Sequence, residues 1–380
     1  MTWVRLDILG WAALAVLLAW LPPRRTQPHA VAALTLVFLS IHAPLSAAIL
    51  SLFALGSWAL LAHENHPTQR LLLVVGAVVV TLVSFKLGAR PQFPTDLGTA
   101  VVPLGLSYYG MRVIHYAVER YKGKLPEHRL DQYLCYLFFL PIIFAGPITG
   151  FPDFLRDLRR RRWDAAVFSR GIERVVSGYA KIVVLGNYAI SIRFAQYIND
   201  NHPSGTPLGE YLDCLRFGSN LYIQFSGYSD IAIGLGLMMG FRIAENFRLP
   251  FLAANIGEFW QRWHMTLTGW CRSYIYLPVA AATRRPAAAT VTAMLVLGIW
   301  HDVSMRFVLW GLYHGVGIVV WQRFRSIRPE IGDGVLSRIT GRLLGTLITF
   351  QFVILSFALA KENTPAAAAR VYTVLLTGWW

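Results

Sequence analysis

The stretch that decides the fold runs from Glu245 to Gly315. It begins ENFRLPFLAANIGEFWQRWHMTLTGWCRSYIYLP (Glu245–Pro278), passes a basic break at Arg284–Arg285, and ends LVLGIWHDVSMRFVLWGLYHG (Leu295–Gly315). Three of the chain's ten histidines lie in it, together with five of its thirteen tryptophans: His264, His301, His314, Trp260, Trp263, Trp270, Trp300 and Trp310. The rest of the chain reads mostly as apolar, lipid-facing sequence. We therefore expect the chemistry of this protein to lie in this stretch.

The composition is that of a membrane protein. Of the 380 residues, 55% are hydrophobic and only 14% are charged, whereas soluble domains carry about 25% charged residues. Several apolar runs approach the roughly 20 residues that a helix needs to cross a bilayer. The sequence therefore predicts one all-α, polytopic integral membrane domain over residues 1–380, with about ten transmembrane or re-entrant helices.

Apolar runs mark the candidate spans. The first lacks a small-x-small cleavage site, so we interpret it as a retained helix and not as a signal peptide. Some of the others are short or carry polar residues, which is typical of re-entrant or interfacial helices. The candidates are Asp7–Leu21, Ala30–Ala43, Leu45–Ala62, Leu71–Phe85, Val101–Ala117, Tyr133–Ala145, Gly171–Ile190, Leu221–Phe241, Ala287–Trp300, Phe307–Arg323, Leu343–Leu359 and Val371–Trp380.

The formal charge of +15 follows from basic residues between the spans. Lys and Arg gather on cytoplasmic loops of membrane proteins, so the basic loop Arg156–Arg162 is expected on the cytoplasmic side. That loop either sets topology alone or also attracts anionic headgroups or an anionic donor such as coenzyme A. Because no polar module collects the charge, we expect no nucleic-acid partner. Three cysteines without metal spacing imply no disulfide framework.

A helix start is expected at Asn255, with Asn as N-cap and Glu258 three residues on. The helix that follows carries polar residues that a lipid-exposed span tolerates poorly, so it lies in the interface or lines a wet cavity. Four residues at spacings of 4, 7 and 11 would share one face of a continuous helix. They are Trp260, His264, Leu267 and Cys271.

His301 ends the apolar run TVTAMLVLGIW and is followed at once by Asp302. A polar group near membrane depth is a functional candidate, but a histidine at the water interface can also simply cap a helix, and position alone leaves both open. His314 lies 13 residues on, which on one helix turns it about 140° away. The two would therefore act together only if the helix breaks between them. We expect His314 to serve close packing beside Gly311 and Gly315.

A histidine in a partly dry cavity can act as a general base. Acyl transfer from a thioester to a hydroxyl needs such a base together with a donor for the developing oxyanion. The sequence contains no GxSxG elbow, P-loop or HExxH motif, and His264 with His301 lacks clear further ligands, so no metal site is predicted. Candidate oxyanion donors are Arg262, Arg272, Trp263 and Trp300.

Five segments, in order, resemble the membrane-bound O-acyltransferase family, and most closely its bacterial branch of alginate O-acetyltransferases and teichoic acid D-alanyltransferases. Each is weak alone, but together they cover more than half the chain. They are VVPLGLSYYGMRVIHYAVERYKG (Val101–Gly123), FFLPIIFAGPITGFPDF (Phe138–Phe154), QFSGYSDIAIGLGLMMGFRIAENFRLPF (Gln224–Phe251), FWQRWHMTLTGWCRSYIYLP (Phe259–Pro278) and GIWHDVSMRFVLWGLYHG (Gly298–Gly315).

The resemblance implies a ring of helices around a central funnel, with peripheral helices in 1–100, a catalytic core in 101–323 and C-terminal helices in 324–380. It implies that His301 is the catalytic histidine and His264 a second functional position. An acyl donor would enter from the cytoplasm and the acceptor hydroxyl from the outer side. Further candidates for lining the substrate path are Tyr228, Ser229, Asp230, Asn246, Trp260, Arg262, Trp263, Arg272, Trp300 and Asp302. The FSGYSD motif could instead only pack helices through Gly227.

The sequence departs from the family pattern at three positions. Asp302 stands where Gly often follows the catalytic histidine, Ser273 where Asp is usual, and Gln224 where Asp often precedes FSGYSD. A carboxylate at Asp302 could raise the pKa of His301 or narrow the tunnel. These changes leave the reaction class in place and leave donor and acceptor open.

The leading expectation is transfer of a short acyl group, acetyl foremost, from a cytoplasmic thioester to a hydroxyl of an exported polysaccharide or cell-envelope glycan. The segment Ile275–Pro278 favours the acetyl branch. The donor would be acetyl-CoA or an acyl carrier protein, with no tightly bound cofactor. Expected partners are membrane lipid and a periplasmic transferase. The protein itself is expected in the bacterial inner membrane, with several spans. The alternatives are D-alanyl transfer to teichoic acid, acylation of a lipid or small secreted molecule, a transporter, or an inactive scaffold.

Overall fold

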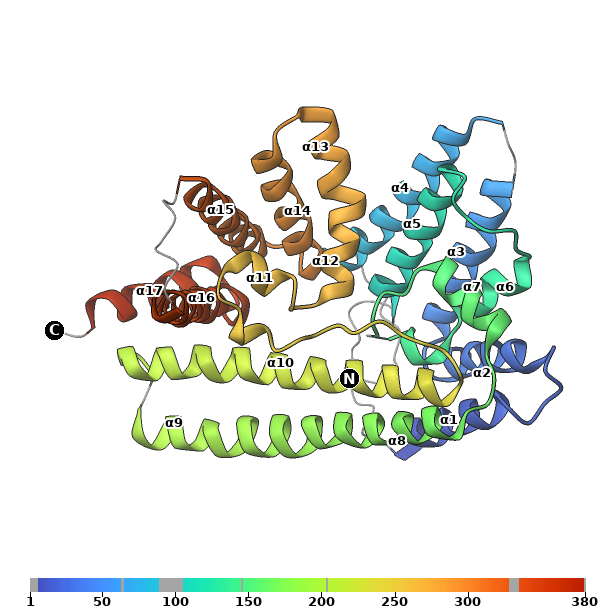
Figure 1. Ribbon diagram of the computed structural model, residues 1–380, viewed down its shortest axis with the longest axis horizontal. Helices are drawn as coiled ribbons and strands as arrows, with labels where there is room; N and C mark the ends of the chain where they lie inside the picture. Colours follow the sequence, from blue (N-terminus) through green and yellow to red (C-terminus); the bar gives the residue numbers. More distant parts are fainter. Residues whose placement is uncertain are drawn as a thin grey trace. The chain divides into compact units, whose positions relative to one another are not determined.

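The protein is helical throughout the part of the chain that the structure describes. A computed structural model describes residues 6–62, 65–88, 105–144, 146–202, 204–327 and 335–378, and Figure 1 shows helices and no strand among them. The all-α class is thereby confirmed. Contacts divide the chain into two compact units: residues 1–179 with 227–244, and residues 180–226 with 245–380. Each is described by itself.

The helices of the first unit begin at recognisable signals, since proline fits the first turn of a helix, where its missing N–H is not needed. Pro44 and Pro67 occupy such positions. The helices are α1 (Leu6–Leu18), α2 (Gln27–His42), α3 (Pro44–Ala62), α4 (Pro67–Lys86), α5 (Leu106–Tyr121), α6 (Leu130–Leu137), the 3₁₀ turn η1 (Leu140–Ile142), α7 (Phe151–Arg160) and α8 (Ala165–Ala180). The end of α10, from Gly227, also belongs here.

Two expectations for this unit are wrong. The predicted span from Tyr133 does not form, because α6 ends at Leu137 and η1 follows. Pro141 lacks the N–H that a continuing helix needs at this point, and Ala145 lies outside the described residues. The basic run Arg156–Arg162 is not a loop, because most of it belongs to α7. Its Arg161 is buried and donates to the Met239 carbonyl oxygen at 3.0 Å.

Within the first unit, α8 and the end of α10 pack through glycines. A Cβ at Gly178 would lie 2.7 Å from the Gly227 carbonyl oxygen, and one at Gly171 would lie 2.8 Å from that of Gly234. Backbones can approach so closely only at glycine, which has no Cβ. Arg174 of α8 donates to the Asp230 carboxylate at 2.6 Å beside these contacts. The Gly227 carbonyl of the FSGYSD motif thus lies close to Gly178 of α8, where only a hydrogen side chain fits.

The second unit holds the whole stretch Glu245–Gly315, in which the chemistry is expected. Its elements are η2 (Lys181–Phe194, π-helical), α9 (Ala195–Asn201), α10 (Pro207–Met238, up to Ser226 in this unit), η3 (Pro250–Leu252), α11 (Ile256–Trp260), α12 (Met265–Cys271), η4 (Arg272–Tyr276, π-helical), α13 (Leu277–Thr283), α14 (Pro286–His301), α15 (Met305–Ile327), α16 (Val335–Lys361) and α17 (Pro365–Thr377). The predicted start at Asn255 is confirmed, because its side chain accepts from the Glu258 N–H at 2.8 Å.

Helices α14 and α15 form a hairpin whose backbones approach closely near the turn, where a Cβ at Gly298 would overlap the Phe307 carbonyl oxygen, and again in the middle. A Cβ at Gly311 would lie 2.5 Å from the Met294 carbonyl oxygen and 3.0 Å from the Leu295 Cα. The helix is interrupted by a short turn, because α14 ends at His301 and α15 begins at Met305. His301 and His314 therefore do not lie on one helix, and both rings contact Trp310.

Four helical segments are long and apolar enough to cross a membrane: Pro44–Ala62, Pro67–Lys86, Ala165–Asn201 and Ile339–Lys361. Shorter apolar helices cover Ile8–Leu18, Gln27–His42 and Pro286–His301. All of these lie among the described residues, whereas Val101–Leu104 and the last two residues of the predicted C-terminal span do not. The count of about ten helices and the central funnel remain predictions.

Candidate active site

Asn246 organises the polypeptide around His264. It is fully buried, and its backbone carbonyl accepts from the Met265 N–H at 2.9 Å. Its side-chain Oδ1 accepts from Thr266 twice, from the N–H at 3.3 Å and from the hydroxyl at 2.9 Å. The first N–H groups of a helix have no partner within it, so Asn246 caps α12 from a distant part of the sequence.

This cap corrects the expectation of one continuous helix through His264. Helix α11 ends at Trp260, and His264 is the N-cap of α12 with a φ of 44°, in the left-handed region. The four residues expected to share a helical face are still all buried, with exposed fractions of 5% or less: Trp260, His264, Leu267 and Cys271. The turn, and not a helical face, thus delivers the His264 ring to the interior.

The hydrogen bonds around Asn246 define the tautomer of His264. A backbone N–H can only donate, so the Asn246 atom that receives the Thr266 N–H is the oxygen. The same oxygen lies 3.1 Å from His264 Nδ1. An oxygen accepts, so Nδ1 carries the proton and Nε2 carries the lone pair in the neutral ring.

Burial keeps the His264 imidazole neutral. The ring is 2% exposed and lies against Phe225 and Trp300, with centroids 4.7 Å and 6.2 Å away. Burial, together with the charge of nearby His301, holds the pKa of His264 well below its ordinary value. His264 lies outside the four candidate spans. It therefore presents a neutral, oriented ring at pH 7.

His301 is the last residue of α14, and its side chain is exposed. Its ring stacks on Phe307 at 5.7 Å and 27°, and it meets the edge of Trp310 at 5.5 Å. Trp300 lies beside it at 4.9 Å. An exposed imidazole held by aromatic contacts suits a base that must reach a substrate hydroxyl.

Trp310 belongs to this site, although the sequence analysis did not single it out. It lies between His301 and His314, with centroids 5.5 Å and 4.6 Å away, and Trp260 packs on it at 5.9 Å. Within the described part of the chain, the buried indole N–H groups of Trp260 and Trp310 have no hydrogen-bond partner. Trp310 lies nine residues after His301, and no local signal predicted their contact, because it depends on the reversal of the chain between α14 and α15.

His314 is placed for packing. It is 1% exposed, and its Nε2 lies 3.0 Å from the Ser356 hydroxyl of α16. Ser356 already donates its hydrogen to the Val353 carbonyl oxygen at 2.6 Å, so His314 Nε2 donates. This bond and the neighbouring Gly311 contact support the structural role expected for His314.

The remaining predicted residues of the second unit lie in different environments. Arg262 donates to Glu258 at 2.5 Å, so its guanidinium is held in an ion pair. Trp263 is buried and stacks on Phe259 at 5.5 Å and 19°. Arg272 is exposed at the start of η4. Among the described residues, no three His, Cys, Asp or Glu side chains converge where they could hold a metal ion.

Tyr228, Ser229 and Asp230 belong to the first unit. Ser229 and Asp230 are buried, with exposed fractions of 2% and 4%, and Tyr228 is half-buried. Asp230 is engaged by Arg174. Their place in the substrate path remains a proposal.

The sequence places this chain in a known family. Residues 98–332 match the membrane-bound O-acyltransferase family, which is well over half of the 380 residues. The matched region includes both His264 and His301. The chain therefore belongs to the membrane-bound O-acyltransferase family.

The names of similar proteins refer to alginate, peptidoglycan and teichoic acid. The chain is 30% identical to the probable alginate O-acetylase AlgI of Pseudomonas aeruginosa, over 76% of this chain and 54% of that protein. It is 25% identical to the peptidoglycan O-acetyltransferase of Helicobacter pylori, over 82% and 66%. It is 28% identical to the teichoic acid D-alanyltransferase of Bacillus subtilis, over 82% and 75%. The chain thus spans between about half and two thirds of the length of the alginate O-acetylases it matches.

Proposed function

We propose that this protein is an O-acyltransferase that moves a short acyl group, acetyl foremost, from a cytoplasmic thioester to a hydroxyl of an exported polysaccharide or cell-envelope glycan. The observation that carries the proposal is the exposed His301 at the end of α14, inside the region that matches the family. The relatives' names support the substrate class, since they include an alginate, a peptidoglycan and a teichoic acid enzyme.

In this mechanism His301 accepts the proton of the acceptor hydroxyl as its oxygen attacks the thioester carbonyl carbon. The resulting tetrahedral intermediate collapses, and the carbon–sulfur bond breaks. The departing thiolate takes the proton from the His301 imidazolium and leaves as a thiol, while the ester stays on the glycan.

His264 acts as a positioning group in this proposal. Its Nδ1–H is held by Asn246, which fixes the orientation of the ring beside Trp300. A neutral ring at this place does not compete with His301 for a positive charge. His264→Ala is accordingly expected to weaken acceptor binding more than donor binding.

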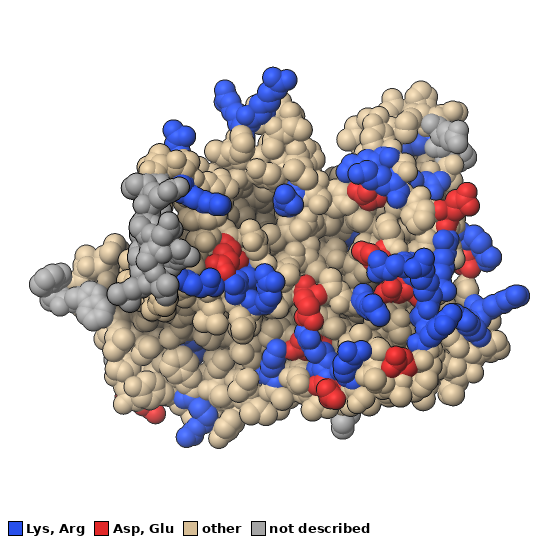
Figure 2. Space-filling model, viewed as in Figure 1, with Lys and Arg blue, Asp and Glu red and all other residues tan. Residues whose placement is uncertain are grey.

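The proposed membrane topology follows from charge. Figure 2 shows basic side chains, and no acidic ones, at the end of the second unit where α13 meets α14, at the top of the view. Arg284 and Arg285 lie there and are exposed. By the positive-inside rule this end faces the cytoplasm of a bacterial inner membrane. The opposite ends of α14 and α16, at His301 and Lys361, then face outward.

The runner-up is D-alanyl transfer from a carrier protein to teichoic acid. It is favoured by the larger share of the Bacillus subtilis relative that the chain covers, 75% against 54% for the Pseudomonas aeruginosa relative. Acylation of a lipid or small secreted molecule uses the same chemistry. For the acetyl reaction, the proposal includes a periplasmic transferase partner.

Donor choice separates these candidates. Purified protein in nanodiscs is given labelled acetyl-CoA in one arm and labelled D-alanyl carrier protein in the other, with host envelope glycan as acceptor. Label in glycan from acetyl-CoA supports the proposal, and label from the carrier protein alone supports the runner-up. Absence of transfer from both donors would contradict the acyltransferase and leave the scaffold and transporter readings.

A further inference from the structure

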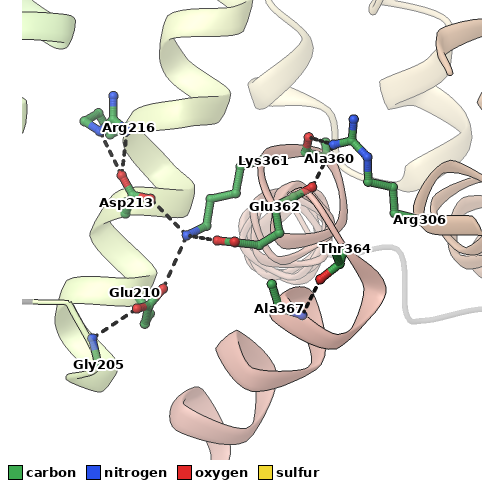
Figure 3. Close-up of polar contacts among 10 residues, drawn as sticks. All are labelled: Gly205, Glu210, Asp213, Arg216, Arg306, Ala360, Lys361, Glu362, Thr364 and Ala367. Atoms are coloured by element: carbon green, nitrogen blue, oxygen red, sulfur yellow. Dashed lines mark hydrogen bonds and ion pairs between the residues drawn. The ribbon is translucent and has the colours of Figure 1, made fainter. Parts of the chain in front are cut away.

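Arg306 joins three parts of the second unit next to His301. It lies in the first turn of α15, and its Nη1 donates to the carbonyl oxygens of Ala360 at 2.9 Å and Glu362 at 2.7 Å (Figure 3). Its Nη2 donates to the Asp302 carboxylate at 3.4 Å. The last carbonyls of a helix lack partners within it, so Arg306 caps the end of α16 with a positive charge where the helix dipole is negative.

The segment that Arg306 grips is itself anchored. Lys361, whose side chain is 9% exposed, contacts the carboxylates of Glu210 at 3.3 Å, Asp213 at 2.9 Å and Glu362 at 2.9 Å. Figure 3 shows Lys361 reaching from α16 toward Glu210 and Asp213 of α10, with Glu362 on its other side. A buried lysine held by three carboxylates keeps the end of α16 against α10, so Arg306 holds a fixed support.

Two contacts carry this support to His301. Asp302 directly follows His301 in the chain and faces Arg306. The Arg306 guanidinium also lies over the Phe307 ring at 4.7 Å, and Phe307 stacks on the His301 imidazole at 5.7 Å. Arg306 therefore contacts both neighbours of the exposed His301: Asp302, which follows it in the chain, and Phe307, which stacks on its ring.

We propose that Arg306 is a positioning residue for His301, and that Asp302 acts as its partner in holding the end of α14. This inference rests on the proposed function, in which His301 is the base. It explains why a carboxylate is tolerated next to the catalytic histidine, since the charge of Asp302 is directed to Arg306. A displacement of about 1 Å of a catalytic group costs on the order of 10²-fold in rate. Loss of the guanidinium should thus lower kcat.

The test compares Arg306→Gln, Arg306→Lys and Asp302→Asn with the control Arg325→Gln. Arg325 lies on the same helix, is exposed, and rests over Trp321 at the far end. With transfer normalised to monodisperse protein, Arg306→Gln should lose about 10²-fold in kcat with KM for the thioester within twofold. Arg306→Lys keeps the charge and should recover part of the loss. Asp302→Asn should add little in the Arg306→Gln background, since the two act through one contact.

A second readout does not depend on transfer. Diethyl pyrocarbonate modifies exposed histidines, and the modification of His301 can be followed by mass spectrometry. Arg306→Gln should raise its rate several-fold by freeing the ring from Phe307, and Arg325→Gln should leave it unchanged. Equal modification rates, or equal kcat for Arg306→Gln and Arg325→Gln, would overturn the positioning role. If wild type transfers no acyl group while Arg306→Gln still raises the modification rate of His301, the proposed function is refuted and the contact between Arg306 and His301 through Phe307 is supported.

Discussion

Replacing Asn246 with alanine removes an acceptor that three donors share. Its Oδ1 lies 3.1 Å from His264 Nδ1, 3.3 Å from Thr266 N and 2.9 Å from Thr266 Oγ1. A buried hydrogen bond contributes about 1 kcal/mol net, so the three together contribute about 3 kcal/mol to the stability of this region. Asn246→Ala should therefore lower the apparent melting temperature in detergent and release the His264 ring.

Asn246→Asp is the matched variant, because it keeps the shape and the acceptor oxygens while adding a negative charge. A carboxylate beside an imidazole favours the imidazolium and raises its pKa. The wild-type pKa of His264 lies well below its ordinary value, so the ring is neutral across the working range. In Asn246→Asp, neutral His264 is regained only at higher pH, and the acid limb of the pH–rate profile should shift to higher pH.

The assay is acyl transfer over a pH series, with thermal stability of the same preparations measured by size-exclusion chromatography. The expected result is a destabilised Asn246→Ala, and an Asn246→Asp that is folded and less active at low pH. If Asn246→Asp keeps the wild-type pH profile, or if Asn246→Ala melts with the wild type, then Asn246 does not hold His264 as argued.

Three further outcomes are expected. Gly311→Val should cost about 1–3 kcal/mol by overpacking against the Met294 carbonyl, seen as loss of monodisperse protein; wild-type behaviour would contradict the close approach of α14 and α15. His264→Ala should raise KM for the acceptor more than KM for the thioester, and an equal rise in both would remove its proposed role. For topology, Asn363→Cys should react with impermeant maleimide on intact cells and Arg285→Cys only after permeabilisation, over a low background because the native cysteines are buried; labelling of both from one side would refute the assignment.

Features that depend on residues close together in the sequence were predicted correctly. The N-cap at Asn255 was predicted because its partner Glu258 is three residues away. The end of α14 at His301 was predicted because the apolar run stops there. The all-α class followed from composition, since long apolar runs with few charges have no other common solution in a bilayer.

The features that were mispredicted or missed depend on residues distant in sequence. The turn at His264 is made by Asn246, 18 residues earlier, and a helical period cannot reveal it. Trp310 reaches His301 only because the chain reverses between α14 and α15. The role of Asp302 is defined by Arg306, whose own partners lie 54 and 56 residues further on. Tertiary contacts of this kind leave no periodic mark.

The central claim is that His301 is the base of an acyl transfer. Wild-type protein and His301→Ala, each purified into nanodiscs and shown to be monodisperse, are given labelled acetyl-CoA and host envelope glycan. The account predicts label in the glycan with wild type and a loss of about 10²-fold or more with His301→Ala, the range that a general base contributes. Turnover of His301→Ala close to that of wild type would contradict the account.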